Sequence, residues 1–103
     1  MEVTKRLTGD VLVVELKGEV DESGCAQIRP KIDATFFTAG ARQVIVDLSK
    51  VSFMDSTGIG MLLGRYKTLR SKGVPIQISS PTPVVDKLLN LSGIYEIMPK
   101  ISG

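Results

Sequence analysis

Residues 44–60 read VIVDLSKVSFMDSTGIG, and this stretch decides the fold. Its first part, Val44 to Leu48, is too apolar to have a face in water, which is typical of a central strand covered by helices and paired in parallel. A polar elbow follows and leads into a helix that begins near Thr57. This arrangement predicts an α/β fold with the strand in the middle of the sheet.

Ser56 stands at the entrance of that helix. The first turn of a helix has unpaired backbone N–H groups and the positive end of the helix dipole, so a hydroxyl there can cap the helix and a phosphate there is tolerated. Because Asp, Ser and Thr are the favoured caps, local chemistry alone favours a capping role for residues 55–57. The same placement suggests a phosphorylation switch at Ser56.

Length and composition set the class of protein. A chain of 103 residues predicts one domain, residues 1–103, that buries roughly two-thirds of its unfolded surface. Aromatic residues make up only 5%, so the core is expected to be aliphatic. The charge of +2 is interspersed and forms no basic stripe, so nucleic acid is not expected as a direct partner. No apolar run approaches the ~20 residues that cross a bilayer and no signal pattern is present, so we expect a cytoplasmic protein without membrane contact.

The side-chain inventory indicates that the protein is not an enzyme. The chain has no histidine, and Cys25 is the single cysteine. Intramolecular disulfides, the usual zinc sites and Ser-His or Cys-His nucleophiles are therefore excluded. We expect no metal ion and no cofactor, and we interpret Cys25 as a small buried hydrophobic residue. A hydrolase that uses Asp47 or Asp55 is the least favoured alternative, because no paired carboxylate accompanies either residue.

Upstream of residue 44, the pattern predicts an antiparallel hairpin followed by a helix. The hairpin strands are residues 2–7 and 11–17, on either side of a Gly-Asp turn. The mixed sheet therefore opens with an antiparallel pair, and the later strands alternate with helices.

The first helix has apolar residues at helical spacing, with Asp21 or Ser23 available as its cap, and it is expected to close near Gly40. Pro30 lies inside this pattern and lacks an N–H group. It predicts a kink in the helix or a late start around Ala26.

Downstream, an apolar stripe predicts a helix over residues 57–72, which Gly73 ends. Its Lys and Arg residues are interpreted as a solvated face. Three more elements are expected: a strand at 74–79, a helix that Pro81-Thr82-Pro83 opens and Gly93 closes, and a short strand at 94–98.

Three glycines, Gly58, Gly60 and Gly64, superficially resemble a dinucleotide-binding fingerprint. The preceding strand is expected to end near Leu48, which leaves a long connection, and no acidic residue that could bind a ribose follows at the proper distance. Close approach of the helix backbone to the sheet or to a partner explains these glycines better.

A strong resemblance to the bacterial anti-sigma factor antagonists, whose fold is the STAS domain, is carried by VSFMDSTGIG at 51–60 and GRYK at 64–67. It extends to GEVD at 18–21 and LSG at 91–93. The sequences FMDS and GRYK look most like the sporulation subgroup, the anti-sigma F factor antagonists. The general stress-response antagonists come second.

This resemblance implies a regulatory cycle. The unphosphorylated protein binds an anti-sigma factor, which is also an ATP-dependent serine kinase, and so releases a sigma factor to RNA polymerase. The kinase then phosphorylates Ser56 and inactivates the antagonist, and a serine phosphatase of the PP2C type restores it. ATP and its Mg²⁺ belong to the kinase.

The resemblance also implies a docking face. It consists of Ser56, the acidic positions beside it, and a rim on the following helix, namely Asp21, Asp55, Thr57, Ile59 and Gly60. The family suggests a monomer in isolation. Because STAS domains also occur in transporters and sensors, a small-molecule or nucleotide-sensing module is the alternative from a different functional class.

Overall fold

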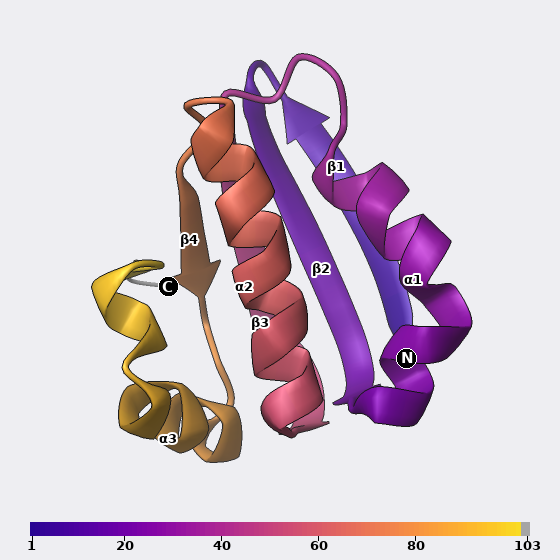
Figure 1. Ribbon diagram of the computed structural model, residues 1–103, viewed down its shortest axis with the longest axis vertical. Helices are drawn as coiled ribbons and strands as arrows, with labels where there is room; N and C mark the ends of the chain where they lie inside the picture. The colour runs from indigo at the N-terminus through magenta and orange to yellow at the C-terminus, as the bar shows by residue number, and fades with distance from the viewer. Residues whose placement is uncertain (102–103) are drawn as a thin grey trace.

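The computed structural model describes residues 1–101, which form one mixed sheet and three helices (Figure 1). The strand order is β1-β2-β3-β4-β5, with β1 antiparallel to β2 and the other neighbours parallel. The elements in chain order are β1 (Glu2–Thr8), β2 (Val11–Val20), α1 (Glu22–Phe36), β3 (Gln43–Met54), α2 (Ser56–Ser71), β4 (Ile76–Ser79), α3 (Pro83–Ser92), the 3₁₀ turn η1 (Ile94–Glu96) and β5 (Lys100–Ile101). The predicted α/β fold with an N-terminal hairpin is confirmed.

The hairpin between β1 and β2 has a two-residue turn. Thr8 pairs with Val11, so Gly9 and Asp10 lie between the strands, and Gly9 has a φ of 62°. Only glycine adopts such an angle at no steric cost, which explains the Gly-Asp signal.

β3 lies in the middle of the sheet, as predicted, with β2 and β4 parallel on either side. Val44, Val46 and Leu48 are fully buried, whereas Ile45 and Asp47 on the opposite face are partly exposed. The expectation that helices cover both faces is therefore wrong. Figure 1 shows α1 and α2 side by side in front of the strands, and the buried residues of all three helices join one mainly aliphatic core.

α1 begins directly after β2 and is kinked. Asp21 is the cap, and its Oδ1 accepts the N–H of Gly24 over 2.8 Å. The backbone of Ile28 leaves the helical region (φ −123°, ψ 19°) two residues before Pro30. The proline ring cannot share space with the turn before it, so the helix bends there rather than starting late around Ala26.

The end of α1 comes earlier than expected, at Phe36 rather than near Gly40. The hydroxyl of Thr38 donates to the carbonyl of Thr35 over 2.7 Å, so a side chain satisfies one of the terminal carbonyls and the helix ends.

β3 is longer than expected, because it continues past Leu48 to Met54. Val20 of β2 pairs with Met54, so the ladder between the two strands extends to this point. Asp55 alone connects β3 to α2, which begins at Ser56, one residue before the predicted start.

The C-terminal part differs from the prediction in two elements, the first of which is β4, because it begins at Ile76 rather than at residue 74. α3 ends at Gly93, whose φ of 77° is the left-handed conformation of a helix stop, as expected. Residues 94–98, however, are not a strand: Ile94 and Met98 are both buried, and the Met98 N–H donates to the Ile94 carbonyl over 2.8 Å. A helical turn places residues four apart on the same side, and the short strand follows at Lys100–Ile101.

No helix in residues 1–101 has both the length and the apolar character needed to cross a membrane.

Candidate functional site

The carboxyl ends of β2 and β3 lie side by side, and each leads directly into a helix. Val20 and Met54 are register partners, and the residue after each is an aspartate that caps the next helix. Asp21 and Asp55 consequently line the same shallow depression, together with residues of the first turn of α1. The structure thus brings together the two acidic residues of the predicted docking face.

Asp55 is the cap of α2. Its Oδ1 accepts the N–H of Thr57 over 2.9 Å and that of Gly58 over 3.2 Å. Two of the unpaired donors of the helix end are thereby satisfied, a contribution of about 1 kcal/mol for such a cap. The capping role is confirmed for Asp55 and wrong for Ser56.

Ser56 is the first residue of α2, and its side chain is exposed. It follows the cap directly and therefore lies at the positive end of the helix dipole. Because Asp55 supplies the cap, the fold does not need the Ser56 hydroxyl for that purpose, and the hydroxyl can be modified without removing the cap.

Gly58 fixes how closely α2 approaches the strand ends. A Cβ atom at this position would lie 2.6 Å from Met54 Cγ and 2.7 Å from the Val20 carbonyl oxygen. The predicted close approach is therefore confirmed for Gly58. It is wrong for Gly60 and Gly64 with respect to the sheet, because a Cβ there would meet nothing within 4 Å.

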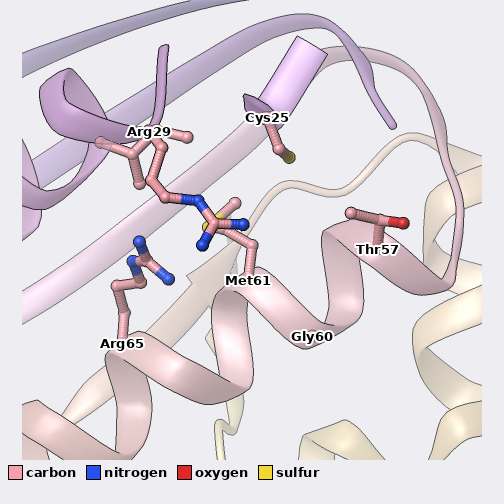
Figure 2. Close-up of a pocket in the computed structure, with 7 residues that line it drawn as sticks. Cys25, Arg29, Thr57, Gly60, Met61 and Arg65 are labelled. Atoms are coloured by element: carbon pink, nitrogen blue, oxygen red, sulfur yellow. The ribbon is translucent and has the colours of Figure 1, made fainter. Parts of the chain in front are cut away.

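The three predicted rim residues do not share one surface. Thr57 and Gly60 line a cavity of about 330 Å³ between α1 and α2, which Figure 2 shows. Ile59 is partly buried and packs against the core instead. Thr57 and Gly60 therefore lie on the side of α2 that faces α1, and Ile59 does not extend that side.

The sequence interpretation missed Arg65, which also lines this cavity. Its side chain is only 14% exposed and forms an ion pair with Asp33, so the expectation of a solvated basic face is wrong for this residue. The Nε atom is buried and has no hydrogen-bond partner within the described residues. A buried donor left without a partner typically costs about 1–3 kcal/mol.

Helical spacing in the sequence is the signal that could have placed Arg65 in this cavity. Thr57, Met61 and Arg65 are four residues apart on α2 and share the side of the cavity, and on α1 Arg29 is four residues after Cys25. The apolar stripe of the helix places Arg65 largely on the opposite, solvated side, whereas the structure places it against α1.

Cys25 is buried at the end of the cavity near the capping residues. Burial raises the pKa of its thiol, and the carboxylates of Asp55 and Asp21 raise it further, while Arg65 and Arg29 act in the opposite direction. A protonated thiol in this position is a packing residue rather than a nucleophile. Within residues 1–101, no three or more His, Cys, Asp or Glu side chains are grouped so as to hold a metal ion.

The sequence profile of the STAS domain matches residues 2–102. The chain belongs to the STAS domain family. This assignment confirms the resemblance that the sequence suggested and accounts for the mixed sheet with its N-terminal hairpin.

The STAS chain is similar to two groups of antagonists. It is 36% identical to the anti-sigma F factor antagonist of Paenibacillus polymyxa, over 86% of this chain and 76% of the relative. It is 29% identical to an anti-sigma-B factor antagonist of Listeria monocytogenes, over 95% of this chain and 84% of the relative.

Two solved structures of SpoIIAA, an anti-sigma factor antagonist, share the fold of this STAS domain. The unphosphorylated form has a TM-score of 0.79 at 30% identity and covers 99% of this chain and 88% of its own. The phosphorylated form has a TM-score of 0.72 at 29% identity and covers 99% of this chain and 91% of its own. The same fold is thus solved both with and without the phosphate.

Proposed function

We propose that this protein is an anti-sigma factor antagonist whose unphosphorylated form binds an anti-sigma factor, and that phosphate on Ser56 switches this binding off. The observation that carries the proposal is the exposed Ser56 side chain at the first position of α2, beside a helix cap that does not involve its hydroxyl. The likeness to antagonists, one of them solved in both phosphorylation states, supports it.

The partner in this proposal is an anti-sigma factor that is also a serine kinase. The kinase brings ATP and Mg²⁺, so the antagonist acts as substrate and binder and not as an enzyme. A PP2C-type phosphatase removes the phosphate and restores binding. The cycle would run in the cytoplasm, where a sigma factor reaches RNA polymerase, and it needs no contact of the antagonist with nucleic acid or membrane.

The docking face in this proposal is built around the two aspartates that follow β2 and β3. Asp55 directly precedes Ser56, and Asp21 lines the same depression as Asp55. Thr57 and Gly60 follow on the side of α2 that faces α1, and Ile59 is included only through its partly exposed surface. A partner that approaches Ser56 therefore meets two carboxylates, which favour cationic groups on the partner through charge complementarity.

The fold should tolerate the phosphate. A phosphoserine adds about −1.5 to −2 charges, and a helix N-terminus returns only about 0.3–1 kcal/mol for a nearby anion. Because the gain is small and the Ser56 side chain is exposed, no rearrangement of the strand ends is required.

Docking of the partner should not tolerate a phosphate on Ser56. An interface that closes over Ser56 must remove water from the phosphate beside Asp55, and an unpaired buried charge costs about 2–5 kcal/mol or more. Since ~1.4 kcal/mol is a factor of ten, the affinity for the partner should fall by a factor of between about 30 and several thousand. Repulsion and desolvation switch the binding while the structure stays the same.

The test uses the full chain with its cognate anti-sigma kinase and ATP. Mass spectrometry should find one phosphate, on Ser56, and binding measured by calorimetry should be lost after modification. Ser56→Ala should stay unmodified yet bind, and Ser56→Asp should bind weakly. Ser52→Ala is the matched control, because Ser52 is also exposed and close in sequence.

Modification of Ser56→Ala would contradict the proposal, and Thr57 would then be the first residue to examine. Equal affinity of the phosphorylated and unphosphorylated chains would also contradict it. Of the two subgroups, sporulation is favoured over the general stress response because of the higher identity to an anti-sigma F antagonist.

A further inference from the structure

The cavity between α1 and α2 carries charges that the proposed switch at Ser56 does not use. Its volume of about 330 Å³ lies at the lower end of the range of about 300–1,000 Å³ for small-molecule pockets. Figure 2 shows the guanidinium groups of Arg29 and Arg65 near each other on one side, with Cys25 and Thr57 on the other. The cavity is thus large enough for a small metabolite and is positively charged at one end.

Arg65 has hydrogen-bonding capacity left over. A guanidinium offers five N–H donors, and the hydrogen bond that pairs Arg65 with Asp33 uses an Nη2 donor. The Nε of Arg65 is buried and has no acceptor within residues 1–101. Because Arg65 lines the cavity, an acceptor bound there would lie next to this guanidinium.

The charge balance at this end also favours an anion. Asp33 neutralises one of the two guanidinium charges, and the exposed Arg29 leaves about one positive charge in excess. The acidic caps act on Cys25 at the opposite end. An anionic group is therefore expected at the arginine end, away from Asp21 and Asp55.

We propose that this cavity binds a small molecule through a phosphate-type oxyanion, with Arg29 and Arg65 as its cationic donors. The planar fork of an arginine matches the paired oxygens of such a group, and an anion between two guanidiniums removes their mutual repulsion. The remainder of the molecule would lie along Ile32 and Met61, which also line the cavity. Binding at this site depends on neither the partner nor the phosphate on Ser56.

The test is a nuclear magnetic resonance titration of the ¹⁵N-labelled full chain with inorganic phosphate, with sodium chloride holding the ionic strength constant. We expect saturable shifts at the backbone amides of Gly60 and Met61 and at the Nε–H signal of Arg65. A parallel titration with glycerol 3-phosphate separates the two sources of this group, since tighter binding of the ester indicates a phosphorylated metabolite rather than free phosphate.

Arg29→Gln is the decisive variant, because Arg29 is exposed and its loss should not disturb the fold. It should weaken phosphate binding on the order of tenfold, as expected for one charge-assisted contact. Arg42→Gln removes the same charge at an exposed site that does not line this cavity and should bind as the wild type does. Arg65→Lys keeps the charge but loses the fork, and it should also bind more weakly.

Two results would overturn the proposal. One is a set of scattered shifts that chloride alone reproduces, with neither phosphate compound saturating. The other is equal affinity of Arg29→Gln and the wild type. Because the titration needs only the purified chain, a failed kinase assay at Ser56 leaves its outcome unaffected.

Discussion

Asp55 donates its backbone N–H to the carbonyl oxygen of Val20 over 3.4 Å, which ties the start of α2 to the end of β2. This contact extends the pairing of β2 with β3 by one residue beyond Met54. Because the two strands are parallel and end together, the aspartates that follow them come to the same edge of the sheet. The position of Ser56 is thus set by the ladder of the sheet rather than by a flexible loop, as precise docking requires.

Replacing the cap of α2 should weaken the fold without touching Ser56. Asp55→Ala leaves the N–H groups of Thr57 and Gly58 without their acceptor and should lower the free energy of unfolding by about 1 kcal/mol, within a range of about 0.5–2. Asp55→Asn keeps an acceptor oxygen and should cost much less. Urea denaturation of both variants measures the difference, and equal losses would show that charge rather than capping stabilises the turn.

Gly58→Ala should be destabilising because the added methyl group collides with Met54 and the Val20 carbonyl. We expect a loss of about 1–3 kcal/mol in the free energy of unfolding, typical of overpacking. Gly64→Ala is the matched control on the same helix, where a Cβ meets nothing within 4 Å, and it should gain about 0.5–1 kcal/mol from helix propensity. The midpoint temperature of thermal unfolding should therefore fall for Gly58→Ala and rise for Gly64→Ala.

The order of the elements could be predicted from the sequence because each has a local signal. The Gly-Asp turn, the proline at the start of α3 and Gly93 at its end determine backbone angles directly, and all three predictions are confirmed. The extent of β3 could not be predicted in this way. The end of β3, up to Met54, is held in the strand by pairing with β2, whose partner residues lie 33 or 34 positions earlier in the chain.

The site could be predicted in part. The order strand, elbow, helix predicts that Ser56 lies at the helix entrance. The sequence does not determine which of residues 55–57 caps the helix, because each is a favoured cap; in the structure Asp55 has the extended backbone of a cap residue. Arg65 was missed because a charged residue at a half-buried helical position resembles a surface residue until α1 is placed over it. Tertiary packing, rather than local propensity, decided both outcomes.

Phosphorylation of Ser56 should leave the stability of the free protein nearly unchanged. The phosphate adds charge at an exposed side chain, and the helix end offsets part of its repulsion with Asp55. We expect the midpoint of urea denaturation to move by no more than the equivalent of about 0.5–1 kcal/mol, as for a surface change. Comparison of the modified and unmodified chains provides the measurement, and a loss of several kcal/mol would mean that the phosphate disrupts the fold rather than an interface.

The cluster of Tyr95, Asp86 and Lys100 should make stability depend on pH at the alkaline end. Burial and then the 2.6 Å hydrogen bond to Asp86 raise the pKa of Tyr95 from the ordinary value of 10.0. A raised folded pKa stabilises the protein below the unfolded pKa, and this stabilisation is lost as the pH rises above it. The stability advantage of the wild type over Tyr95→Phe should therefore be constant from about pH 7 to pH 9 and shrink above pH 10. Urea denaturation at each pH gives this difference, and a constant value up to pH 11 would show that the phenol ionises equally in both states.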